Sequence, residues 1–121
     1  MNHFAITSTL RDLMLADSKI KALVGSRIYP LIAPNGTEGD FIVYQRDGYA
    51  IDKTKMGIYL TQPMVYLNIV SEDYDRSQEL AGLIFNCLVG KYDTMEISLE
   101  DSTEDMTDKK YIQVLLFKIK L

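Results

Sequence analysis

The sequence predicts an α+β fold in which a mainly antiparallel sheet carries two or three helices packed on one face. The first observation is the order of the patterns: two helical segments, a group of strands, one long helical segment and a closing pair of strands. Helices and strands are therefore segregated rather than strictly alternating, as is typical of α+β proteins. The second observation is size, because 121 residues of average globular composition fit a single domain, expected to span residues 1–121.

Two short helices are predicted first. Residues 4–15 place apolar side chains at helical spacing on one face. Asp17 is suited to cap a second helix that continues to Val24, because its carboxylate can accept hydrogen bonds from the free amides of the first turn. Gly25 is expected to end that helix, since glycine readily adopts the left-handed conformation found there.

Strands are predicted in the next part of the chain. Residues 27–29 form a short strand that ends at a proline, and residues 30–40 contain two prolines and two glycines that indicate a loop. Residues 41–46 and 59–70 have the apolar, β-branched and aromatic character of strands. Residues 47–58, rich in glycine and charge, are expected to form an exposed loop between them.

The last third of the chain is predicted to hold one long helix and two strands. Residues 73–89 carry an apolar stripe at helical spacing, and Ser71 or Asp73 is expected to cap this helix. Residues 95–100 alternate apolar and polar side chains, which indicates a half-buried strand with an acidic outer face. Residues 101–110 are polar throughout and are expected to be a turn region before the closing strand, residues 111–121.

Charge limits the partners of the chain. The formal net charge is −4, and residues 61–121 hold eleven acids and only six bases. An acidic chain repels phosphate backbones, so binding to nucleic acid is not expected. Apolar runs of the length that crosses a membrane are absent from the sequence, and the first residues lack the pattern of a signal peptide, so a cytoplasmic location is expected.

The residues that usually carry catalysis or bind metals are scarce. One histidine and one cysteine exclude the usual zinc cages, and the acidic run 100–105 lacks the turn glycine of a calcium loop. Cys87 falls on the apolar stripe of the long helix, where a buried and unreactive thiol is expected. Nucleotide-binding and nucleophile-elbow motifs are absent. The sequence therefore predicts no catalytic residue, no metal site and no cofactor.

Tyrosines around residues 47–58 suggest a contact surface instead. Tyrosine combines a large apolar face with a polar tip, which suits contacts between proteins. Tyr44, Tyr49, Tyr59 and Tyr66 lie in or beside the strands that flank this segment. At the level of the loop, the candidate interface residues are Arg46, Asp47, Tyr49, Lys53 and Lys55.

An ordered set of motifs covers nearly the whole chain and includes a helical pattern between Tyr74 and Gly90 before a final strand. The motifs are residues 10–17 (LRDLMLAD), 22–30 (ALVGSRIYP), 33–34 (AP), 41–45 (FIVYQ), 65–70 (VYLNIV) and 111–117 (YIQVLLF). Together they resemble the phage tail-completion family, formerly a domain of unknown function, which contains tail terminators and siphophage head–tail joining proteins. The chain departs from the family at Gly39-Asp40, where members often carry a proline before the aromatic residue.

The resemblance implies a structural phage or prophage protein that acts without catalysis. Such proteins end the tail tube and join it to the head. By this resemblance the partners are further copies of the chain in a ring, commonly of six, together with the major tail tube protein and head connector proteins. Its location would then be the tail or neck of the virion, after assembly in the host cytoplasm.

Two other functions remain open at this point. An intracellular α+β module could use its sheet face to bind a protein or a small ligand without catalysis. A small hydrolase is the least favoured alternative, because no nucleophile and base can be paired from the sequence.

Overall fold

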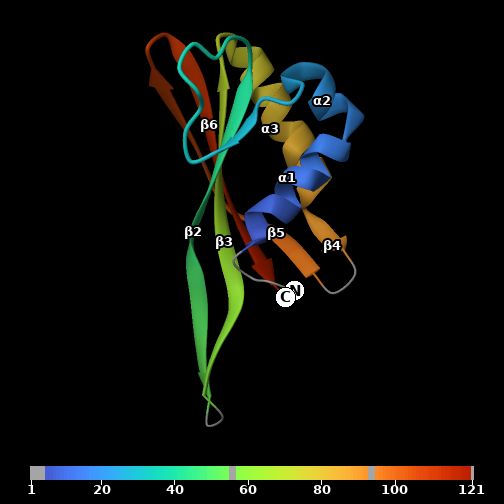
Figure 1. Ribbon diagram of the computed structural model, residues 1–121, viewed down its shortest axis with the longest axis vertical. Helices are drawn as coiled ribbons and strands as arrows, with labels where there is room; N and C mark the ends of the chain where they lie inside the picture. The colour runs from blue at the N-terminus through green and yellow to red at the C-terminus, as the bar shows by residue number, and fades with distance from the viewer. Residues whose placement is uncertain (1–4, 55–56, 93–94, 121) are drawn as a thin grey trace.

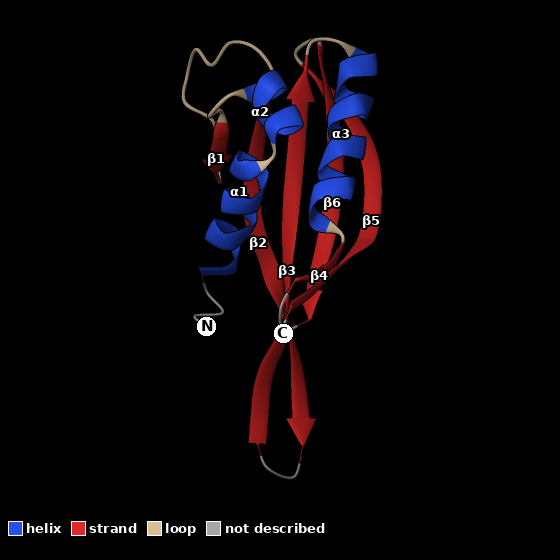
Figure 2. Ribbon diagram, turned by 90° about the vertical axis from the view of Figure 1, so that its right-hand side faces the viewer, coloured by secondary structure: helices blue, strands red, loops and turns tan. Residues whose placement is uncertain are grey.

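The computed structural model describes residues 5–54, 57–92 and 95–120, with the backbone alone for the described residues between 48 and 61. Within these ranges, three helices pack on one face of a six-stranded sheet (Figure 2). The helices are α1 (Ile6–Ala16), α2 (Ser18–Val24) and α3 (Tyr74–Leu88). The strands are β1 (Ile28–Pro30), β2 (Phe41–Thr54), β3 (Gly57–Ser71), β4 (Gly90–Tyr92), β5 (Met95–Thr107) and β6 (Lys110–Lys120).

The sheet is mostly antiparallel. Its strand order is β1-β2-β3-β6-β5-β4, and among these neighbours β1 and β2 form the one parallel pair. Helix α1 packs on β2, and α3 packs on β3, β6 and β5. The predicted α+β fold, with helices on one face of a mainly antiparallel sheet, is confirmed.

The core lies between the sheet and the helices. Alternate residues of the two central strands point toward the helices and are buried, as the period-two pattern predicts. Among the described residues, Phe117 is the largest side chain of the sheet that is fully buried. The other buried residues at this layer include Val65, Leu67, Ile69, Leu115 and Ile119 from the sheet, and Leu10, Met14, Leu80, Ile84 and Leu88 from the helices.

The helix ends follow the predicted capping. The carboxylate of Asp17 accepts hydrogen bonds from the amides of Lys19 and Ile20, at 2.9 and 3.1 Å, and so fixes the first turn of α2. Gly25 follows α2 with a positive φ of 60°. Asp73 caps α3 in the same way by accepting from the amide of Arg76.

The prediction of a loop over residues 47–58 is wrong. Strands β2 and β3 stay paired from Phe41 opposite Val70 to Thr54 opposite Gly57, and Figure 1 shows this hairpin extending far beyond the helices. Glycine and charged residues have low strand propensity, but each strand supplies the hydrogen-bonding partner of the other. Two register shifts, between Arg46 and Gly48 and between Ala50 and Ile51, interrupt the ladder without ending it.

The predicted turn region over residues 101–110 is also wrong in extent. Strand β5 continues to Thr107, opposite Lys110 of β6. The turn consists of Asp108 and Lys109, with positive φ values of 50° and 64°, the combination that a two-residue type I′ hairpin requires. The polar residues 101–107 are a strand because the strongly strand-forming β6 provides a continuous ladder beside them.

Candidate assembly surfaces

The far half of the β2–β3 hairpin is a two-stranded ribbon. We define the ribbon as residues 48–54 of β2 and 57–63 of β3. Strand β6 pairs with β3 only from Met64 onward, and β1 pairs with β2 only opposite Ile42–Tyr44, so in the described part of the chain both edges of the ribbon lack a neighbouring strand. At about 3.4 Å per residue, the ribbon reaches roughly 20 Å beyond the body. Two-stranded hairpins are marginally stable in water, so the ribbon is suited to being completed by another molecule.

The interface candidates from the sequence lie on or beside this ribbon. Arg46 is half-buried and Asp47 is exposed, both at its base. Tyr49 and Lys53 belong to its β2 strand, opposite Pro63 and Ile58, and Lys55 lies outside the described residues.

One of the tyrosines near this segment is not a surface residue. Tyr44 is only 5% exposed and belongs to the core, so the suggestion of a contact role is wrong for it. Tyr66 is half-buried on the helix-free face of the sheet, because its neighbours Val65 and Leu67 point toward the helices.

Two aliphatic side chains project into solvent just after β1. We call Leu31 and Ile32 the knob; their exposed fractions are 69% and 77%. Leu31 has a positive φ of 64°, which costs a residue with a Cβ about 1–2 kcal/mol. The Leu31 amide nevertheless donates to the Tyr44 carbonyl at 2.9 Å, so the knob is held against β2. Strained, exposed apolar residues of this kind are typical of binding surfaces.

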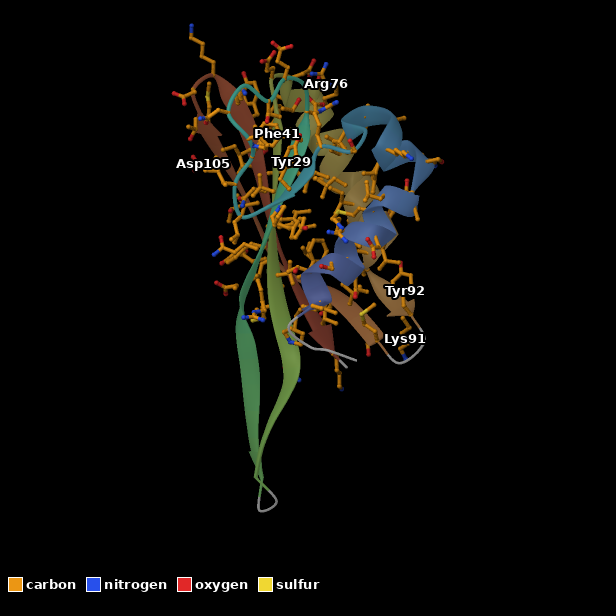
Figure 3. The ribbon with its side chains drawn as sticks, viewed as in Figure 1. Tyr29, Phe41, Arg76, Lys91, Tyr92 and Asp105 are labelled. Carbon is orange, nitrogen blue, oxygen red and sulfur yellow. The ribbon has the colours of Figure 1, made fainter. Side chains whose placement is uncertain are left out.

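The loop that carries the knob is fastened at its other end. Asp40, 4% exposed, accepts two hydrogen bonds from the guanidinium of Arg76 in α3, at 2.8 and 3.0 Å, and this carboxylate raises the pKa of Arg76. Arg27 donates to the Asp40 carbonyl at 2.8 Å. Gly39 is required here, because its φ is 82° and a Cβ would lie 3.0 Å from the Arg27 Nη2. Figure 3 shows Arg76 at the same end of the body as Phe41, the residue after Asp40.

The opposite edge of the sheet is acidic. Strand β4 pairs with β5 only at Met95–Ile97, so residues 98–107, which we call the acidic edge, lack a strand neighbour on their outer side within the described chain. Strand β5 contains five acids and no base. The carboxylates of Asp101 and Asp105 accept from the amides of Ser102 and Met106, at 2.9 and 2.7 Å. These carboxylates occupy amides that would otherwise be free to pair with another strand.

A polar network joins the acidic edge to α3. Gln113 of β6 donates to Glu104 at 2.7 Å and to the hydroxyl of Ser77 at 3.2 Å. The hydrogen bond from Gln113, together with a smaller effect of the Tyr74 hydroxyl, lowers the pKa of Glu104, because both favour its ionised form. Glu104 in turn raises the pKa of Tyr74.

The described residues offer little for catalysis or metal binding. Cys87 is half-buried rather than fully buried, its thiol donates to the Leu13 carbonyl, and burial raises its pKa to about 11. The described residues contain no group of three or more histidine, cysteine or acidic side chains placed to hold a metal ion. A thiol with a raised pKa is a poor nucleophile at neutral pH.

None of the described helices is both long and apolar enough to span a membrane. A groove of about 350 Å³ on the helix-free face contains no histidine, cysteine or lysine. It is lined by Gln45, Tyr66, Asn68, Asp101, Thr103, Val114 and Leu116.

Comparison with known proteins finds the same fold in a virus-like particle. No family model matches the chain, and no curated protein matches it. A chain of the solved structure described as "Virion of native gene transfer agent (GTA) particle" superposes with a TM-score of 0.73. The two chains are 15% identical, and the match covers 92% of this chain and 90% of the other. The fold is shared.

Sequence reasoning missed the knob, and it predicted an acidic strand face only for residues 95–100, not for the edge that continues to Thr107. An apolar pair inside a loop that contains prolines was a usable signal for the knob, because such loops are usually polar. The roles of Asp40 and Arg76 left no signal, since the two residues are far apart in the chain and are paired only by packing.

Proposed function

We propose that this protein is a structural component of a phage-like virion that ends the tail tube and joins it to the head connector. The observation that carries the proposal is the fold, which extends over 92% of this chain in the match to the gene transfer agent particle. The motifs that resemble tail-completion proteins support the more specific role. In this proposal the protein acts by contact rather than by catalysis and needs no cofactor.

The proposed assembly is a ring of six copies. A ring forms when one surface of a subunit binds a different surface of the next and the rotation closes. The two sheet edges are unlike, since one carries the knob and the other is acidic, and this supports contacts of that type.

The proposed contacts with other virion proteins are made through the ribbon. The major tail tube protein and the head connector would lie beyond the ring on either side. Residues at the base of the ribbon and along it would make these contacts. Binding would offset the conformational entropy that these residues lose. They are Arg46, Asp47, Tyr49, Lys53 and Lys55.

Electron microscopy of the purified protein mixed with tail tubes of the same phage or prophage tests the function. We expect a ring at one end of each tube. The matched control replaces residues 48–63 with an Asn-Gly turn, which shortens the hairpin but keeps the core between sheet and helices. This variant should remain folded and fail to bind tubes.

Two outcomes would count against the proposal. Tubes that stay uncapped in the presence of folded wild-type protein overturn the function as a tail terminator. Capping by the shortened variant overturns the role of the ribbon and leaves the function standing.

A further inference from the structure

Asn35 and Gly36 form the tip of a turn in the loop between β1 and β2. Both residues are exposed, and a Cβ built on Gly36 would meet no atom within 4 Å. Gly36 has a positive φ of 80°, which the absence of a side chain permits without steric cost. The turn is therefore open to solvent around Gly36.

Hydrogen bonds hold the two ends of this turn but not the pair between them. The amide of Thr37 donates to the Pro34 carbonyl at 3.2 Å, and the Thr37 hydroxyl donates to the same oxygen at 2.6 Å. Among the residues that the structure describes, neither the side-chain amide of Asn35 nor the backbone amide of Gly36 makes a hydrogen bond. Hydrogen bonds of the fold therefore restrain neither amide group.

These two amide groups can react with each other. The deprotonated backbone nitrogen of Gly36 attacks Cγ of Asn35, so that a nitrogen–carbon bond forms and a five-membered succinimide ring closes. The bond from Cγ to Nδ2 breaks, and the nitrogen leaves as ammonia with the proton that the backbone nitrogen lost. Water then opens the ring at either carbonyl and gives aspartate or isoaspartate. A side chain on the following residue hinders this attack, and glycine has none.

The other described asparagines lie where the backbone is held. Asn68 belongs to β3, and Asn86 belongs to α3. The amide that follows Asn86 lies inside the helix, where it donates to the carbonyl four residues earlier. Asn86 is as fully accessible in class as Asn35, since both are exposed, so exposure does not distinguish the two sites. The freedom of the next backbone amide does.

We propose that Asn35 is a site of spontaneous modification in the folded protein, which converts it to aspartate and isoaspartate as the protein ages. Residues 31–40 contain Glu38 and Asp40 and no base, so the reaction adds a third acid to this loop. Isoaspartate also lengthens the main chain of the turn by one carbon atom, because the chain then runs through the former side chain. The knob lies in the same loop, so newly made and aged molecules differ on a candidate assembly surface.

Mass spectrometry of the folded, full-length chain tests the proposal. The protein is kept in warm neutral buffer, and samples are digested over time to follow the replacement of the Asn35 amide nitrogen by oxygen. Labelling by an isoaspartyl methyltransferase identifies the isoaspartate product. The same measurement on the urea-unfolded chain gives the rate that the local sequence sets by itself.

The effect of folding on each asparagine is the result that decides. Folding should slow the conversion of Asn35 by less than about fivefold, because the fold restrains neither reacting group. Asn86 is the internal control, and folding should slow its conversion by more than about fivefold, because the helix holds the next amide. Slowing of Asn35 by more than this, or by as much as Asn86, overturns the proposal.

Asn35→Gln is the matched variant. Glutamine keeps the amide, but it would have to close a six-membered ring, which forms far more slowly than the five-membered one. The variant should stay folded and show no conversion at this position over the same period. A mass change in this loop that persists in Asn35→Gln would arise from another reaction and would also overturn the proposal.

Discussion

The two long hairpins of this protein differ in what holds their far ends. The β5–β6 hairpin continues through a polar, acidic segment, yet Glu104 and Gln113 tie it to Ser77 at the start of α3. The β2–β3 hairpin continues through a segment of similar polarity, and its far half has only its own ladder in the described chain. Hydrogen bonds between two strands suffice to extend both hairpins, and among the described side chains Gln113 anchors the β5–β6 hairpin to α3.

This difference distinguishes the hairpin that stabilises the fold from the hairpin that is the candidate for contacts with other proteins. The anchored hairpin belongs to the folding unit, because its network joins a helix to two strands. Neither edge of the ribbon has a strand beside it in the described chain, so its backbone is open to contacts with other proteins. The three changes below test this separation, beginning with the largest expected effect on stability.

Phe117→Ala should destabilise both hairpins together. Phe117 is fully buried in β6, between Val65 of β3 and Leu99 of β5, so the substitution leaves a cavity where the two hairpins meet. We expect the free energy of unfolding to fall by about 3–5 kcal/mol in urea denaturation. Phe41→Ala, at a half-buried ring on the helix-free face, is the control and should cost clearly less. Equal losses would show that the core is not centred where both hairpins join.

Glu104→Gln should reduce the dependence of stability on pH. The pKa of Glu104 is lowered below its usual value of 4.5 in the folded chain, so its ionised form stabilises the fold above that pH. This contribution is lost as the pH falls through the lowered value. The midpoint temperature of thermal unfolding should therefore be higher for the wild type than for the variant at neutral pH. This difference in midpoint temperature should narrow in acid.

The control for this change is Glu96→Gln, at an exposed carboxylate near the other end of β5. Glu96→Gln should leave the dependence of thermal stability on pH close to that of the wild type. If Glu104→Gln lowers the thermal stability by the same amount at neutral and at acid pH, the anchoring role of the Glu104 charge is contradicted.

Proline at both Ile51 and Asp52 should have the smallest effect on stability. Consecutive amides of a strand point to opposite edges, so one of the two prolines must remove a hydrogen bond to β3. We expect the free energy of unfolding to change by less than about 1 kcal/mol, because the ribbon is remote from the core. Amide exchange in the ribbon should accelerate while the body stays protected. The double alanine variant at the same positions should keep amide exchange in the ribbon close to the wild-type rate. Unfolding of the whole protein by the prolines would contradict the separation of the ribbon from the folding unit.

Much of the fold could be predicted from the chain. Period-two burial in residues 65–69 and 115–119 and the caps at Asp17 and Asp73 are local patterns, and the structure confirms them. The full lengths of both hairpins could not be predicted, since residues 47–58 and 101–107 have weak strand propensity and become strands only opposite a partner. For the candidate assembly surfaces, the sequence pointed to residues at the ribbon, whose contact role stays a prediction, and to an acidic face over residues 95–100, but not to the knob or to the edge strand that continues to Thr107.

The sequence by itself determined which residues enter the core and where the helices begin, because both depend on spacing and on near neighbours along the chain. The tertiary structure decided which surfaces stay open. Whether Leu31 and Ile32 are exposed, whether Asp101 and Asp105 lie on a sheet edge, and whether Asp40 meets Arg76 all depend on strand order and on contacts between distant residues. These exposures and contacts arise only once the sheet has formed, because they depend on the pairing of strands that are far apart in the chain.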